Sequence, residues 1–249
     1  KLKKRLIEPP EILIDLKGLS ELDYIKMENG SLKIGALSTI YSVATSNMVV
    51  EKFNILSQAA KSIAAFQIQN RGTIVGNICN AVPSADSAPA LLVLDARLNI
   101  KKKDNERKVS INEFFIGPNK TILNRDEIVT EIEIPETAYP SKGIYYKLST
   151  RGRMDLATVG VAVLLAKENG RFLDVKIGLG AVAPTPFRPK SAEDMLKGEK
   201  ISKEIINNAA RVASEEAKPI DDHRASATYR KIMIETLVKR AISRLAEVE

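Results

Sequence analysis

The sequence predicts an α+β protein in which strands and helices are segregated along the chain. Two β-rich runs, residues 158–166 and 172–181, are joined through Asn169-Gly170, and an Asn-Gly step between such runs is a strong hairpin signal. Residues 201–217 and 222–248 show the spacing of amphipathic helices. Together they give an α+β outline, with two domains divided near residue 140.

Composition limits the class of protein further. The chain has 249 residues, of which 44% are hydrophobic, enough for one large domain or two smaller ones. No apolar run approaches the roughly 18 residues of a membrane helix, and no signal-peptide pattern opens the chain, so we expect no membrane insertion. The single cysteine, Cys79, excludes an internal disulfide framework or a cysteine-ligated cluster and is typical of a cytoplasmic protein.

Charge and histidine content argue against two other classes. The net charge of +7 is dispersed among acidic residues and is not accompanied by an aromatic stacking surface, which disfavours a nucleic-acid partner. The single histidine, His223, argues against a histidine-rich metal site and against a Ser-His-Asp triad.

The N-terminal part is expected to hold strands, then helices, then strands. Strands are predicted at 11–16 and 32–36, separated by a polar stretch that contains Asn29-Gly30. Helices follow from a Ser38 cap to about Thr45 and over 52–65. Residues 67–86 read as a compact loop and 88–96 as a buried helix, because the first is rich in Gly, Asn, Ser and Pro and the second is almost entirely apolar. Further strands are predicted at 97–102, 108–111 and 128–134.

A linker is predicted at residues 136–139, between Pro135 and Pro140. It divides the chain into residues 1–138 and 142–249. The second part holds the hairpin, an amphipathic helix over 201–217 and a long helix that we expect Asp222 to cap.

The loop before the buried helix contains the residues best suited to chemistry. Gly72 and Gly76 allow close backbone approach, and Thr73 places a hydroxyl beside backbone N–H groups. Such a loop suits a phosphate or a ribityl chain. Asp86 could cap the following helix or accept hydrogen bonds from a ribose diol. Composition alone favours an ordinary turn over a binding loop.

The longer string IAAFQIQNRGTIVGNICNAVPSADSAPALLVLDA, residues 63–96, resembles the FAD-binding medium subunit of molybdenum hydroxylases. These are enzymes of the carbon monoxide dehydrogenase, xanthine dehydrogenase and aldehyde oxidoreductase types. Residues 69–77 and 81–86 follow the family pattern. Residues 147–161, 179–186 and 219–230 are similar to later family segments and occur in the same order.

The resemblance implies a fold, and this sequence departs from the family pattern at two points. The expected fold is an FAD-binding domain of the PCMH (vanillyl-alcohol-oxidase-like) type, N-terminally incomplete, followed by a C-terminal domain of an antiparallel sheet plus helices. The family's other phosphate loop, Ala-Gly-Gly-Thr-Asp, is absent and is expected just upstream of Lys1. Val75 stands where the family has a glycine, which would be unfavourable if that position required a positive φ.

The resemblance also implies the cofactor-binding residues. Those expected to line the FAD pyrophosphate and ribityl chain are Ile63, Ala64, Thr73, Ile74, Val75, Gly76 and Asn77. Asp86 is expected at the adenosine ribose, Val129 near the isoalloxazine and Lys147 at its pyrimidine edge, where a cation balances the charge of the reduced ring. Asp155 is expected close to the ring. From the residues alone, Lys147 could equally be a solvated strand residue and Asp155 a cap.

The function implied by the resemblance is electron transfer. Molybdopterin would lie on a large subunit and two 2Fe–2S clusters on a small subunit, in a dimer of heterotrimers, with electrons passing to FAD here and then to an external acceptor. Carbon monoxide, aldehydes, purines and aromatic acids all stay open as substrates of the complex. Two alternatives stay open as well: a stand-alone FAD oxidoreductase, and a non-enzymatic assembly subunit that has lost FAD.

Overall fold

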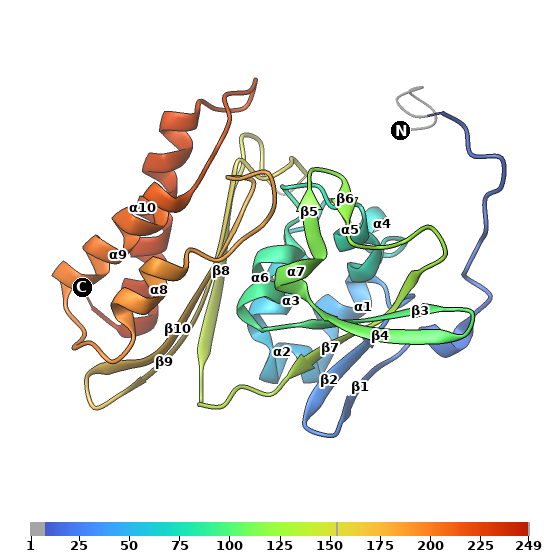
Figure 1. The fold of residues 1–249 in the computed structure, drawn as a ribbon. Coiled ribbons are helices and arrows are strands. Elements are labelled where there is room, and N and C mark those ends of the chain that lie inside the picture. Colours follow the sequence, from blue (N-terminus) through green and yellow to red (C-terminus); the bar gives the residue numbers. More distant parts are fainter. Residues whose placement is uncertain (1–7, 153, 249) are drawn as a thin grey trace.

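The computed structural model describes residues 8–152 and 154–248. Two antiparallel sheets are separated by one layer of helices, and a second layer of helices covers the far side of the C-terminal sheet (Figure 1). The mixture of helix and antiparallel sheet confirms the predicted α+β class.

The first sheet has the strand order β1-β2-β7-β3-β4. Its strands are β1 (Ile25–Glu28), β2 (Ser31–Gly35), β3 (Arg97–Lys102), β4 (Asn105–Ser110) and β7 (Ile128–Pro135). Alternation places Leu32, Ile132 and Leu98 on one face of the sheet, where they pack into the hydrophobic core of this part of the chain. We call this cluster the first core. Charged side chains, among them Glu133 and Lys108 at 2.5 Å, occupy the other face.

Short helices cover the core face of this sheet. They are α1 (Ile40–Thr45), α2 (Asn47–Lys52), α3 (Asn54–Lys61), α4 (Phe66–Gln69), α5 (Ile74–Cys79), α6 (Ser87–Val93) and α7 (Ile111–Phe114). A 3-10 turn at Ser20–Leu22 and the small β5 (Phe115–Gly117) and β6 (Lys120–Thr121) pair complete this part.

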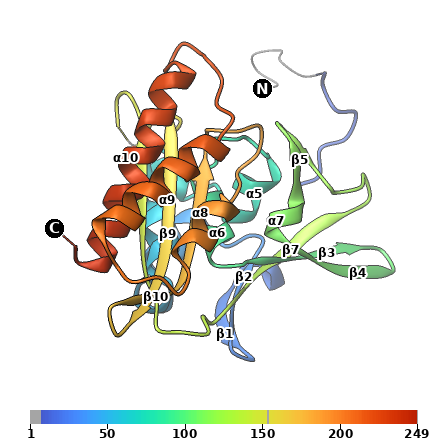
Figure 2. The same cartoon turned by 60° about the vertical axis from the view of Figure 1, so that its left-hand side comes forward.

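The second sheet lies between two helical layers. It consists of β8 (Lys142–Leu148), β9 (Val159–Glu168) and β10 (Arg171–Gly180), with β9 central. One face packs against α8 (Lys190–Leu196), α9 (Lys203–Glu216) and α10 (Ala227–Ala246), which lie in front of the sheet in Figure 2. Tyr145, Ala162 and Leu164 on the opposite face join the first core beside α3 and α6. This face of β8 and β9 therefore forms one wall of the first core.

Several predicted elements are confirmed, including the hairpin turn at Asn169-Gly170. The strand at 11–16 is wrong: these residues form no strand in the described chain, and Ile12, Leu13 and Ile14 are exposed. A short β-branched and apolar run forms a strand only where a neighbouring strand supplies hydrogen bonds. Strand β1, by contrast, was not predicted.

Local capping also differs from the prediction. Thr39, not Ser38, caps α1 by accepting from the Ser42 N–H, while the Ser38 hydroxyl donates to the Tyr24 carbonyl. Ser226, not Asp222, caps α10. The predicted helix over 52–65 breaks at Phe53 and ends at Lys61.

Candidate functional site

Side chains from α6 and β8 meet in a buried cluster where the second sheet joins the first core. The Lys147 Nζ donates to Asp86 Oδ2 at 2.8 Å, and the Tyr145 hydroxyl donates to Asp86 Oδ1 at 2.8 Å. The Lys147 and Asp86 side chains are only 7% and 8% exposed. A charged pair so far from solvent is costly unless its geometry and hydrogen bonds are good, and both carboxylate oxygens are satisfied here. We call Asp86, Tyr145 and Lys147 the Asp86 cluster.

Burial changes the proton affinity of two of these groups. Desolvation raises the pKa of Asp86, with the Lys147 charge and the hydrogen bonds from Lys147 and Tyr145 acting in the opposite direction. Desolvation, followed by the Asp86 charge, raises the pKa of Tyr145 well above its ordinary value. Tyr145 therefore remains a neutral donor at physiological pH, and its hydrogen bond helps to keep Asp86 ionised.

The loop after α3 is fastened to the Asp86 cluster. The Lys147 Nζ also donates to the Ser62 carbonyl at 3.1 Å, and the Gln69 amide donates to the Ile63 carbonyl at 2.8 Å. Ala64 follows with a φ of +47°, a conformation that costs free energy in a non-glycine residue and persists where the surroundings hold it. Two predicted site residues, Ile63 and Ala64, thus lie directly beside predicted Lys147.

The predicted phosphate loop is largely helical. Thr73 caps α5 by accepting from the Gly76 N–H at 2.9 Å, and Ile74 and Val75 are buried in the core. Gly76 is exposed, and Thr73 and Asn77 are half-buried, so α5 presents a small polar face away from the core. The helical conformation of Val75 removes the expected objection to a valine at this position, since no positive φ is required there.

Asn77 connects this face to the Asp86 cluster. Its side-chain oxygen accepts from the Ser87 hydroxyl at 2.6 Å, and Ser87 is the residue after Asp86. Hydrogen bonds therefore bring together the segments 62–64, 73–77, 86–87 and 145–147, although they are far apart in sequence.

The structure brings together two residues that were expected at different parts of FAD. Asp86 was expected at the adenosine ribose and Lys147 at the pyrimidine edge, and their side chains touch each other. The alternative role of Asp86 as a helix cap is wrong, because its side chain makes no cap hydrogen bond to α6.

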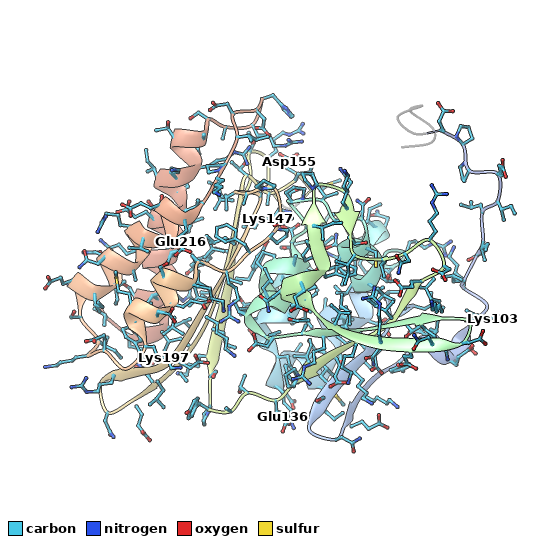
Figure 3. The ribbon with its side chains drawn as sticks, in the orientation of Figure 1. Lys103, Glu136, Lys147, Asp155, Lys197 and Glu216 are labelled. Carbon is cyan, nitrogen blue, oxygen red and sulfur yellow. The ribbon has the colours of Figure 1, made fainter. Side chains whose placement is uncertain are left out.

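The other two predicted residues lie outside the Asp86 cluster. Val129 is buried in the core of the first sheet, opposite Ile100. Asp155 lies in the loop after β8, above Lys147 in Figure 3, and pairs with Arg151 at 2.8 Å. That hydrogen bond is the main cause of the lowered pKa of Asp155.

The sequence analysis did not find Tyr145 or Ser62. Tyr145 could have been found from strand alternation, because residues two apart in β8 share a face and Lys147 was already a candidate. Ser62 contributes a backbone carbonyl, which no side-chain pattern predicts.

Comparison with known families identifies the chain. Residues 1–137 match the FAD-binding domain in molybdopterin dehydrogenase, and residues 144–245 match the C-terminal domain of the carbon monoxide dehydrogenase flavoprotein. The chain belongs to the FAD-binding medium subunits of molybdenum hydroxylases. This confirms the family inferred from residues 63–96.

Individual relatives match nearly the whole of this chain and most of their own length. The chain is 31% identical to the glyceraldehyde dehydrogenase medium chain of Sulfolobus acidocaldarius, covering 98% of this chain and 86% of that protein. It is 34% identical to the xanthine dehydrogenase FAD-binding subunit of Escherichia coli O157:H7, covering 93% and 80%. The structure of carbon monoxide dehydrogenase from Hydrogenophaga pseudoflava matches with a TM-score of 0.94 and 34% identity, covering 99% of this chain and 85% of that one.

The residues present fit FAD. The exposed polar face of α5 offers small groups to a phosphate or a ribityl chain, and Lys147 supplies a buried cation nearby. The described residues contain no group of three or more His, Cys, Asp or Glu side chains suited to a metal ion. No helix among them is long and apolar enough to cross a membrane.

Proposed function

We propose that this chain holds FAD and passes electrons from 2Fe–2S clusters on a small subunit to an external acceptor. The observation that carries this proposal is the Asp86 cluster, a buried cation-carboxylate pair next to the small polar face of α5. When bound, FAD supplies the electron chemistry, and the protein supplies binding, orientation and charge. The molybdopterin of the complex would lie on a large subunit, in a dimer of heterotrimers.

Each part of the site has a distinct role in this proposal. Thr73, Gly76 and Asn77 would approach the pyrophosphate and ribityl chain closely, because no large side chain stands on this face. Ile63 and Ala64 would border the cofactor from the loop that Lys147 fastens. Lys147 would place its positive charge at the flavin end, where reduction adds negative charge, and Asp86 would orient the ammonium group.

Val129 and Asp155 have less support. Val129 is nearly covered by the first core, so it would approach FAD mainly through its backbone. The Asp155 carboxylate is engaged by Arg151, and a role near the ring would require that pair to face the cofactor.

A visible absorption spectrum tests the function. The protein, co-expressed with its partner subunits, is expected to carry flavin bands near one FAD per chain, and Asp86→Ala and Lys147→Ala are expected to lose them. Asp95→Ala is the matched control, since Asp95 lies just beyond the other end of α6 and pairs with Lys176 at 2.5 Å. This control is expected to keep the bands.

The outcomes also separate the alternatives. A colourless protein that does not take up added FAD would leave only an assembly subunit. A yellow protein that purifies alone and oxidises a small substrate would instead favour a stand-alone oxidoreductase.

A further inference from the structure

We propose that Tyr145 is a positioning residue of the flavin site, acting on FAD through Asp86 and Lys147. The Tyr145 hydroxyl fixes the Asp86 carboxylate, which in turn fixes the direction and the effective charge of the Lys147 ammonium group. The inference rests on the proposed function.

The hydrogen bonds of the carboxylate carry the first step. Tyr145 donates to Oδ1 and Lys147 donates to Oδ2, each at 2.8 Å. With a separate donor on each oxygen, rotation of the carboxylate would break both hydrogen bonds. Without Tyr145, Oδ1 would lose its donor, and the ammonium, which also donates to the Ser62 carbonyl, would be oriented by a less restrained carboxylate.

The surrounding backbone holds the Tyr145 hydroxyl in place. The Gln58 side-chain oxygen on α3 accepts from the Tyr145 N–H at 3.0 Å, which fastens β8 to the first core. Across the sheet, a Cβ added to Gly160 would lie 3.1 Å from the Tyr145 hydroxyl. Gly160 pairs directly with Lys147 in the β8–β9 register. Because Gly160 has no side chain, the Tyr145 hydroxyl has room to lie beside it.

Charge sharing carries the second step. A carboxylate that accepts from a neutral hydroxyl as well as from an ammonium group has its negative charge partly balanced by each donor. The Lys147 charge is then less completely neutralised by Asp86 and acts more strongly on its surroundings. In a buried site this difference is not screened by water. Tyr145 thus favours added negative charge on a flavin beside Lys147.

The experiment compares Tyr145→Phe with Tyr146→Phe in the assembled complex. Tyr146 is the adjacent residue but faces α10, where its hydroxyl is 3.5 Å from Arg244 Nη1. Tyr145→Phe is expected to weaken FAD binding by about 3- to 10-fold, the value of one hydrogen bond, and to lower the flavin midpoint potential. Tyr146→Phe is expected to change neither, as measured by FAD titration and by spectroscopic redox titration.

Two results would overturn the inference. The first is a folded Tyr145→Phe complex with wild-type FAD affinity and potential. If that variant does not assemble, Gly160→Ala, which crowds the hydroxyl but keeps all three side chains, decides the question: weaker binding and a lower potential support the role, and unchanged values overturn it. A wild-type complex without flavin would be a different result, because it would contradict the proposed function itself.

Discussion

Helix α6 has an aspartate beyond each end, and the two are held in contrasting ways. Asp86 precedes the helix, is almost fully buried, and meets one lysine and one tyrosine. Asp95 follows the helix, is 40% exposed, and pairs with Lys176 at 2.5 Å and Arg188 at 2.6 Å. Water screens the Asp95 contacts, whereas the charge of the Asp86 cluster acts in a medium of low dielectric.

The network at the Asp95 end also contains a buried carboxylate, but that group is fully used in holding the fold. Glu193 accepts from the Ile177 N–H, from Arg188 through two nitrogens and from Lys190. It thereby ties α8 to β10. The comparison teaches that burial of a charge does not by itself identify a functional site. The Asp86 end of α6 differs because it lies next to the small polar face of α5.

Breaking the Asp86 cluster is expected to give the largest effect. Lys147→Met leaves a buried carboxylate without its cation and is expected to lower the free energy of unfolding by about 3 kcal/mol. Adding Asp86→Asn removes the unpaired charge and is expected to restore most of that loss in denaturant unfolding, while FAD remains unbound. Recovery of FAD binding in the double variant would show that the ion pair is only structural.

Removing the Glu193 charge, in the network at the Asp95 end of α6, is expected to lower the stability of the fold without changing FAD affinity. Glu193→Gln keeps the side-chain shape but weakens the hydrogen bonds to Arg188, so we expect a loss of about 2 kcal/mol in the free energy of unfolding. FAD affinity is expected to stay at the wild-type value, because Glu193 lies on the α8 side of the second sheet. Loss of FAD at full stability would contradict the division between the two ends.

A smaller effect on stability is expected from pH, through the carboxylate of Asp222. Its pKa is lowered, whereas that of Asp86 is raised. Burial raises the pKa of Asp222, but the N–H groups of Arg224 and Ala225 and the Arg230 side chain outweigh it and hold the value at about 2. A lowered folded-state pKa contributes stability above the unfolded value of 3.8, and that stability is lost as the pH falls toward 2. For Asp86 the sign is reversed: its raised pKa lowers stability as the pH rises above 3.8.

Asp222→Asn tests this assignment by thermal unfolding between pH 2 and pH 6. The variant is expected to be about 1 kcal/mol less stable at pH 6 and to show a shallower decline toward pH 2. A variant that keeps the wild-type slope would remove Asp222 as a source of acid sensitivity.

The sequence by itself determined the elements whose signals are local. The hairpin turn at Asn169-Gly170, the apolar run of α6 and the helical spacing of α9 and α10 each depend on residues a few positions apart, and the structure agrees with them. The resemblance over residues 63–96 also identified the family and several segments that converge around Lys147.

Tertiary structure alone decided how those segments meet. Asp86 and Lys147 are 61 residues apart, and no periodicity predicts that α6 presents one to β8 beside the other. Likewise, residues 11–16 have the apolar composition of a strand, but strand formation depends on a partner for their backbone groups. Local patterns determine which face of an element is apolar; packing between distant elements determines which polar groups are buried together, and that pairing creates the site.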